Sequence, residues 1–120
     1  MKIITLNSCR EFIAGDKCFI REMINPLKEK LDLNYSLAYA RVKGGEKTQK
    51  HRLSASEVYY IISGKGIMHI NDEVAEVKQN DTIYIPPHAL QWIENPEKED
   101  LEFLCIVEPA WQPDMEQVLS

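Results

Sequence analysis

Short strand-like segments separated by turn signals run through most of the chain, and they restrict the folds that it can adopt. Residues 58–62 are five consecutive β-branched or aromatic residues, a composition typical of β-strands. Further segments of this kind, each bounded by Gly, Pro, Asn or Asp, lie at 35–42, 67–70, 73–77, 82–85, 91–93 and 101–107. Many short strands with turns roughly every eight to twelve residues, and scarcely any helical period, predict an antiparallel β-sandwich or barrel.

The two ends of the chain carry weaker signals. Residues 3–6 and 18–23 are short strand candidates joined by a Gly-Asp turn at 15–16, and residues 27–33 fit either one helical turn or a loop. Near the other end, Pro113 begins a segment that fits a short helix or an extended tail. We expect this tail to lie over the outside of the barrel.

Length, charge and cysteine usage limit the organisation of the protein and its partners. A chain of 120 residues can bury one hydrophobic core and, without repeats or linkers, is predicted to form a single domain over residues 1–120. The net charge of −5 and the lack of basic runs argue against nucleic acid or an anionic membrane surface as a partner. The three cysteines show no CxxC spacing, which is typical of reduced thiols. Without a signal-peptide or membrane-span pattern, we expect a cytoplasmic protein.

Two stretches, 45–64 and 80–95, share a strand, turn, strand pattern and contain most of the side chains suited to chemistry. In the first, His51 and Glu57 lie on either side of a short polar turn at 54–56. If the two strands fold back on each other as a hairpin, the imidazole and the carboxylate come within side-chain reach. We therefore expect them to converge on one point.

Together the two stretches resemble the paired motifs of the cupin superfamily, in particular small single-domain proteins of the cupin 2 type that are mannose-6-phosphate isomerase-like. The matching positions are Gly45, His51, Glu57 and Gly64 in the first motif and Pro86 and Asn95 in the second. The resemblance covers about residues 36–108. It implies an all-β fold, the cupin double-stranded β-helix or jelly-roll barrel of antiparallel strands, with a short C-terminal helix or an extended tail.

The metal-ligand set that the resemblance implies is degenerate in this chain. The departures are Leu53 and Gln91 in place of histidines, and Asn80 and His88 in place of glycines. The candidate metal ligands that remain are His51, Glu57 and Gln91. The family's activity is therefore not carried over with its fold.

Strand geometry predicts that these residues share one pocket. Because alternate residues of a strand point to the same side, Glu57, Tyr59 and Ile61 share a face, and so do Gln91 and Ile93. The predicted pocket contains the polar residues His51, Glu57 and Gln91 and the wall residues Leu53, Tyr59, Ile61 and Ile93.

Two interpretations of this pocket are open. In one, His51, Glu57 and Gln91 bind a divalent metal such as Zn, Mn, Fe or Ni, for which mixed nitrogen and oxygen ligands are suitable. In the other, His51 and Glu57 form a buried ion pair or hydrogen bond that Gln91 completes, because buried polar groups need partners. Either arrangement gives Glu57 a perturbed environment.

The sequence leaves the orientation of three further polar residues open. His88 is either a solvated turn residue or an extra metal ligand supplied from the rim if its turn folds inward. His69 faces inward or outward depending on strand register, because a slip of one residue reverses its side. Arg41 either reaches the mouth of the pocket, where it would hold an anionic substrate, or lies exposed at a strand end.

Two classes of function are consistent with this pocket. A metal-dependent enzyme would resemble the sugar-phosphate isomerase-like or dioxygenase-like cupins, with Glu57 or Tyr59 as the candidate catalytic residue that moves a proton. A binding module would close around a small-molecule ligand without a metal and without catalysis. The substrate or ligand is not specified by either pattern.

Apolar residues alternate with the pocket-facing ones and are expected to point outward. They are Val58, Tyr60 and Ile62 on one strand and Leu104 and Ile106 on another. This is more apolar surface than a monomer normally exposes, and cupins that resemble this chain commonly pair through a sheet. We expect a homodimer; the alternative is that the N-terminal segment and the tail cover this surface.

Overall fold

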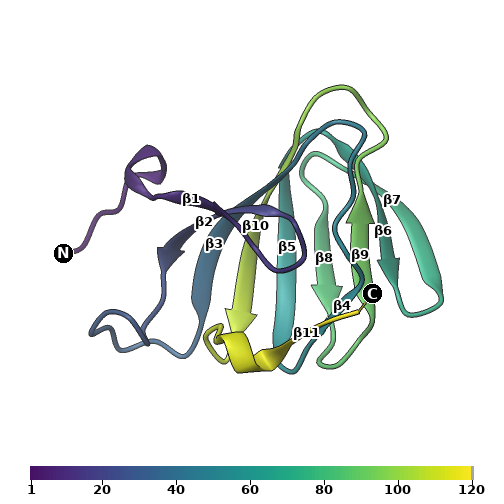
Figure 1. The fold of residues 1–120 in the computed structure, drawn as a ribbon. Helices are drawn as coiled ribbons and strands as arrows, with labels where there is room; N and C mark the ends of the chain where they lie inside the picture. The colour runs from purple at the N-terminus through teal and green to yellow at the C-terminus, as the bar shows by residue number, and fades with distance from the viewer. Residues whose placement is uncertain (120) are drawn as a thin grey trace.

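The computed structural model describes residues 1–119, and its strands form two antiparallel sheets that face each other (Figure 1). The first sheet has the order β1-β2-β3-β10-β5-β8, with the bounds Glu11–Ile13, Phe19–Ile24, Ser36–Val42, Leu101–Glu108, Ser56–Ser63 and Thr82–Ile85. The second has the order β11-β4-β9-β6-β7, with the bounds Glu116–Val118, His51–Leu53, Gln91–Glu94, Lys65–Ile70 and Glu73–Lys78. The prediction of an antiparallel all-β fold is confirmed. Within the described chain, no helix is long and apolar enough to span a membrane.

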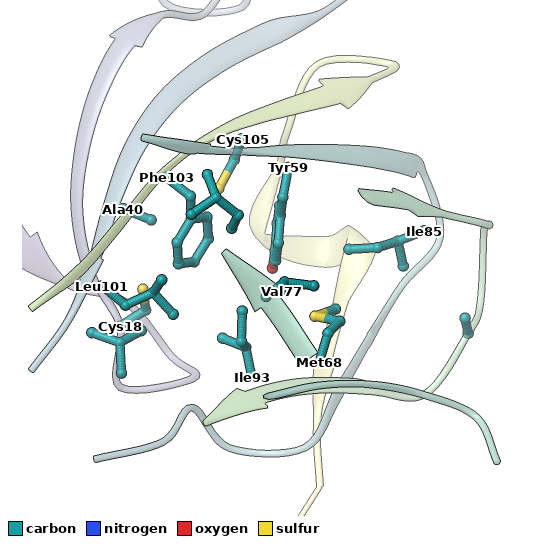
Figure 2. Packing of buried hydrophobic residues seen from close by; sticks show 13 residues of the cluster. Cys18, Ala40, Tyr59, Met68, Val77, Ile85, Ile93, Leu101, Phe103 and Cys105 are labelled. Atoms are coloured by element: carbon teal, nitrogen blue, oxygen red, sulfur yellow. The ribbon is translucent and has the colours of Figure 1, made fainter. Parts of the chain in front are cut away.

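Alternating burial along the strands explains how the sheets pack. In β5, Glu57, Tyr59 and Ile61 are buried and the residues between them face outward, as the two-residue period of a strand requires. β10 adds Leu101 and Phe103 to the same interior, and the rings of Tyr59 and Phe103 are 4.5 Å apart between centroids. In Figure 2, Tyr59, Leu101 and Phe103 of the first sheet face Met68, Val77 and Ile93, core residues of the second sheet.

The segment between β4 and β5 crosses from one sheet to the other and is not the predicted hairpin. β4 pairs with β9 and β11, whereas β5 pairs with β10 and β8. Leu53 and Ala55 are buried in a small apolar cluster with Val107, and the burial of these side chains favours a chain that crosses the barrel. His51 and Glu57 therefore approach each other from opposite sheets, and the expectation that they meet across a hairpin is wrong.

The first strand lies later in the chain than predicted. Residues 3–6 form no strand; one turn of 3-10 helix occupies Leu6–Ser8, and β1 follows it. Ile3 is 81% exposed, so this segment lacks the burial that would hold it against a sheet. β1 pairs with β2 across the predicted turn at 15–16. Residues 27–33, for which two forms were open, are turn and irregular chain.

The C-terminal tail belongs to the second sheet and does not lie over the outside of the barrel as predicted. Pro113–Met115 forms one turn of 3-10 helix, whose first position suits proline. β11 then pairs antiparallel with β4, with Glu116 opposite Leu53. β11 thus forms the edge of the second sheet, and backbone pairing with β4 holds the tail in the barrel, where Glu116 lines an interior cavity.

The turn between β1 and β2 connects the first sheet to the second. Asp16 Oδ1 accepts a hydrogen bond of 3.1 Å from the Cys18 amide, and Lys17 adopts the left-handed conformation with φ 70°. The carbonyl oxygen of Asp16 accepts a hydrogen bond of 2.8 Å from the amide of Gln49, just before β4. This turn, the purple loop of Figure 1, therefore borders the space between the two sheets.

Candidate functional site

A cavity of about 240 Å³ lies between the two sheets next to the β1–β2 turn. Its apolar walls include Phe12, Ile20, Leu53, Phe103, Val107 and Trp111. Its titratable lining includes Asp16, Glu22, His51, Glu57 and Glu116, together with Tyr59 and the thiols of Cys18 and Cys105. A concave site with apolar walls and a few converging polar groups is the usual form of a small-molecule pocket.

A hydrogen-bonded chain of three buried side chains crosses the interior beside this cavity. The Tyr59 hydroxyl donates to Gln91 Oε1 over 3.1 Å, and Gln91 Nε2 donates to Glu57 Oε1 over 3.0 Å. β5 supplies Tyr59 and Glu57, which share a face, and β9 of the opposite sheet supplies Gln91. Gln91 is only 1% exposed, and both ends of its amide have partners within the protein, as a buried amide requires.

His51 lies beside this chain and bonds elsewhere. It is the cross-strand partner of Gln91 in the β4–β9 pair, and it is 5% exposed. Its Nδ1 is 2.9 Å from the carbonyl oxygen of Gln49; because a carbonyl only accepts, Nδ1 carries the hydrogen and donates it. Its Nε2 faces Asp16 Oδ2 at 3.6 Å, which is too long for a hydrogen bond.

Burial controls the protonation of the acidic groups around the cavity. It is the main cause that raises the pKa of Glu57 from 4.5 to about 7; the Gln91 hydrogen bond and the charge of His51 oppose it, and the carboxylates of Asp16 and Glu116 add to it. Burial also raises the pKa of Glu116, and the nearby Asp16 charge raises it further. These carboxyl groups therefore ionise less readily than they would in water.

The other predicted pocket residues lie in different environments. Leu53 and Tyr59 line the cavity, and burial holds the pKa of Tyr59 well above its usual value, so its proton stays on the hydroxyl. Ile61 and Ile93 are 0% and 1% exposed in the packed core and, like Gln91, do not line the cavity, which differs from the prediction. His88 is exposed on its turn, and its side chain does not fold inward. Its backbone amide donates a hydrogen bond of 2.7 Å to the carbonyl oxygen of Leu53.

His69 and Arg41, whose orientation was open, both point away from the cavity. The His69 ring stacks on the neighbouring indole of β9 at 4.1 Å between centroids, and its Nε2 is 2.6 Å from Glu94 Oε2. The Arg41 guanidinium pairs with Glu11 at 2.8 Å and Asp100 at 3.1 Å. Because Arg41 alternates along β3 with the buried Ala40 and Val42 and does not line the cavity, it is not placed to hold an anion at the mouth of the pocket.

Sequence reasoning missed the carboxylates at the edge of the cavity. Asp16 comes from the β1–β2 turn, Glu22 from β2 and Glu116 from β11, all outside the stretch 36–108 that carries the family resemblance. Their positions depend on how the N-terminal hairpin and the tail pack on the barrel. The one available signal was the Gly-Asp turn at 15–16, which places a carboxylate where the chain reverses.

The donor set does not fit the metal that the family resemblance implies. Across the described part of the chain, no three His, Cys, Asp or Glu side chains are grouped so that they could hold a metal ion. Gln91 uses its carbonyl oxygen to accept from Tyr59, and Leu53 offers no donor atom at the other replaced position. His51 and Glu57 remain, which are fewer than the three or four protein ligands of typical metal sites.

Removing the Tyr59 hydroxyl should destabilise the protein, because Gln91 Oε1 would be left buried without its donor. We expect Tyr59→Phe to lower the free energy of unfolding by roughly 1–3 kcal/mol, the cost of an unsatisfied buried polar group. The matched control is Tyr35→Phe at a position that is 41% exposed, whose change should alter stability by less than about 0.5 kcal/mol. Urea unfolding measures both; equal losses for the two variants would contradict the role of the buried chain.

The fold and the sequence motifs together define a cupin. A family model described as the cupin domain matches residues 38–107, which is more than half of the chain and extends from β3 into β10. The chain therefore belongs to the cupin family, and the family predicted from the motifs is confirmed. The finer likeness to mannose-6-phosphate isomerase-like proteins stays a prediction.

Several individual proteins are similar to this chain. It is 38% identical to an uncharacterized protein of Methanocaldococcus jannaschii, over 100% of this chain and 98% of that protein. It is 30% identical to the oxalate-binding protein of Thermotoga maritima, over 72% of this chain and 74% of that protein. These identities agree with membership of the family.

Solved structures of cupins superpose on this fold. A Cupin 2 conserved barrel domain protein from Salinispora arenicola aligns with a TM-score of 0.78 at 15% identity, covering 96% of this chain and 92% of that chain. An oxalate decarboxylase from Bacillus subtilis aligns with a TM-score of 0.83 at 20% identity, covering 99% of this chain and 32% of that chain. At such identities the likeness concerns the fold alone, and it confirms the predicted jelly-roll barrel.

Proposed function

We propose that this cupin binds a small organic molecule in its barrel cavity without a resident metal. The observation that carries the proposal is the bonding of Gln91, whose amide links Tyr59 to Glu57 inside the protein. The residue that would complete a metal site is thus engaged in internal hydrogen bonds. Leu53, at the other replaced position, forms part of the cavity wall. Both departures from the family's ligand set therefore favour a binding cavity over a metal centre.

The size and lining of the cavity support this function. Its volume of about 240 Å³ exceeds the roughly 150 Å³ of an engineered cavity that binds benzene. Leu53, Phe103 and Val107 offer apolar contact area, while Glu57 and His51 offer polar atoms that would orient a ligand. A small ring or branched aliphatic group with one polar end fits such a lining.

A neutral molecule of this size tests whether the cavity is a binding site. We expect 2-phenylethanol, titrated to millimolar concentration, to shift the amide resonances of cavity-lining residues in a saturable way. Ala38→Phe should abolish these shifts, because Ala38 lines the cavity. The matched control is Val74→Phe, at a site that is 62% exposed on β7 of the other sheet and does not line the cavity. Shifts that persist unchanged in Ala38→Phe would place the binding elsewhere and contradict the proposal.

Two alternatives have less support. The name of the Thermotoga maritima relative reports oxalate binding, but among the residues that the structure describes no lysine or arginine lines the cavity, and a dianion is bound best by cationic donors. A sugar-phosphate isomerase-like or dioxygenase-like metalloenzyme would need the ligand set that Leu53 and Gln91 interrupt. We therefore propose neither activity for this chain.

We further propose a homodimer formed through the outer face of the first sheet. Tyr60, Tyr84 and Ile106, which lie on the adjacent strands β5, β8 and β10, are 40%, 62% and 38% exposed. Val58 and Leu104 lie between them in the strand registers and make the apolar face continuous. The tail pairs with β4 of the other sheet, so it does not provide the alternative cover. A second copy related by a two-fold axis would bury this face.

A charge placed on this face should separate the protomers. We expect Ile106→Arg to shift the mass measured by light scattering at micromolar concentration from dimer to monomer, because a buried unpaired guanidinium disfavours association. The control is Val74→Arg, at a site 62% exposed on β7 of the other sheet, which should leave the mass unchanged. A monomeric wild type under the same conditions would contradict the proposed dimer.

We also propose that residues 1–120 form one cupin domain and that the protein is cytoplasmic. β1, β2 and β11 extend the two sheets of the matched cupin core, which supports a single cooperative unit. Cys18 and Cys105 are buried free cysteines, which is usual in a reducing compartment. A single cooperative unfolding transition would agree with the first proposal, and two separate transitions would contradict it.

A further inference from the structure

When Glu57 is ionised, the polar atoms that are open to the cavity are hydrogen-bond acceptors. Glu57 is 7% exposed, and its Oε1 accepts from Gln91, but its Oε2 accepts no hydrogen bond from residues 1–119. In this described part, every fully buried side-chain nitrogen or oxygen has a partner, so Oε2 is not sealed and opens on the cavity. His51 Nε2 is likewise open to the cavity, because it lies 3.6 Å from Asp16 Oδ2 and has no hydrogen-bond partner among residues 1–119. In a neutral imidazole this nitrogen presents a lone pair.

The strong donors near these acceptors are already used within the protein. The Tyr59 hydroxyl donates to Gln91, and Gln91 Nε2 donates to Glu57. The Trp111 indole, whose N–H is a donor only, lies beside Glu116 and counteracts part of the rise in the pKa of that carboxyl. A ligand that satisfies the open acceptors must therefore bring its own hydrogen-bond donors.

The charges around the cavity favour a cation. Asp16, Glu57 and Glu116 line it, and no lysine or arginine within residues 1–119 does so. Of the lining carboxylates, Glu22 is balanced by Lys28, whose Nζ is 2.7 Å from its Oε1. Carboxylates beside low-dielectric walls focus a negative potential, which attracts cations and repels anions. Because these groups do not form a metal-holding cluster in the described chain, an organic cation suits them better than a metal ion.

On this basis, and resting on the proposed function, we propose that the cavity selects small primary amines, whose ammonium group binds between Glu57, Asp16 and Glu116 and whose apolar body lies against Leu53 and Phe103. An ammonium group supplies three donors and the required charge. The apolar walls then remove the rest of the molecule from water. The ligand class is thus an alkyl- or arylalkyl-ammonium ion.

Three molecules of nearly equal shape test this selectivity. We use 2-phenylethylamine as the cation, 2-phenylethanol as the neutral control and phenylacetate as the anion. Each is titrated into the full-length protein by calorimetry and amide chemical-shift mapping at about pH 8, above the pKa of about 7 of Glu57, so that this carboxyl is ionised. The amine should bind about tenfold or more tightly than the alcohol, because a charge-assisted hydrogen bond in a cavity adds to the shared apolar contacts. Phenylacetate should bind more weakly than the alcohol.

Charge-removing variants assign the selectivity to the cavity. Glu116→Gln and Glu57→Gln should each weaken binding of the amine by about tenfold and change binding of the alcohol by less than about twofold. Two variants are used so that a folding defect in one leaves the other as the test. The control is Glu76→Gln at an exposed site on β7, which should leave the affinities for both molecules unchanged.

The outcomes separate this inference from the proposed function. Equal affinity for the amine and the alcohol, with both bound in the cavity, would overturn the ligand class and leave a small-molecule-binding protein. Tighter binding of phenylacetate would also overturn the ligand class. Failure of all three molecules to bind the wild type would overturn both proposals. Loss of the amine's advantage in Glu116→Gln or Glu57→Gln, but not in Glu76→Gln, is the result we expect.

Discussion

Replacing Glu57 by glutamine should make the protein more stable at neutral and alkaline pH, and the gain should disappear in acid. Burial raises the pKa of Glu57 from 4.5 to about 7. Ionising this carboxyl is therefore less favourable in the native state than in the unfolded chain, and the difference lowers the free energy of unfolding. At about pH 8 a shift of this size corresponds to roughly 3 kcal/mol. Glutamine carries no charge and keeps an oxygen that can accept from Gln91.

The direction of this effect follows from proton binding. Between about pH 4.5 and 7 the native Glu57 stays protonated while the unfolded one ionises, so the native state binds more protons and its stability falls as the pH rises. The stability that the protonated Glu57 contributes to the native state is fully present below the unfolded pKa of 4.5 and is lost once the pH passes about 7. The wild type should therefore show a steeper fall in stability over this window than Glu57→Gln does.

Urea unfolding at a series of pH values measures this difference. The exposed Glu76→Gln variant on β7 is the matched control, and its stability should follow that of the wild type within about 0.5 kcal/mol. A gain for Glu57→Gln that is the same at every pH, or a loss at about pH 8, would mean that the Glu57 carboxylate is paired in a way that its burial does not indicate.

Restoring both imidazoles should turn the cavity into a metal site. The double variant Leu53→His, Gln91→His would present three imidazoles beside Glu57 and should bind Zn²⁺ tighter than the wild type by about three orders of magnitude or more, since imidazole is the stronger donor. Without metal it should be less stable by on the order of 2–4 kcal/mol, because it loses the Gln91 hydrogen bonds and buries imidazoles without assured partners.

Calorimetric titration with Zn²⁺ and thermal melts with and without the metal measure these two effects. Metal should recover the lost stability, because it binds the native state alone. Leu53→His is the matched single variant and should show an intermediate affinity, since it adds one imidazole and keeps Gln91. Absence of metal binding in the double variant would mean that these side chains do not converge on one point, which would contradict the site itself.

The strands and their inner faces could be predicted because their signals are local. The five β-branched and aromatic residues at 58–62 form the middle of β5, and the two-residue period correctly assigned Glu57, Tyr59 and Ile61 to the interior. The motif spacing also predicted the family correctly. One motif position, Gly64, has a structural reason to be glycine, because it adopts φ 93° and lies close to the carbonyl oxygen of Asp100. A side chain at Gly64 would be strained and would meet backbone.

The connections between sheets could not be predicted, because a local pattern fits more than one pairing. A polar turn at 54–56 is compatible with a hairpin and with a crossing, and the choice depends on the burial of Leu53 and Ala55 with residues far along the chain. The same reason explains the misplaced tail and the missed carboxylates of Asp16 and Glu116. Their positions depend on long-range packing that no short stretch of sequence records.

Titrating chelator-treated wild-type protein with Mn²⁺ and Zn²⁺ in a calorimeter at neutral pH shows whether the barrel cavity lacks a resident metal. Because Gln91 is engaged by Tyr59 and Glu57, we expect binding weaker than micromolar for both ions. One-to-one binding tighter than micromolar that is lost in Glu57→Gln would contradict this expectation.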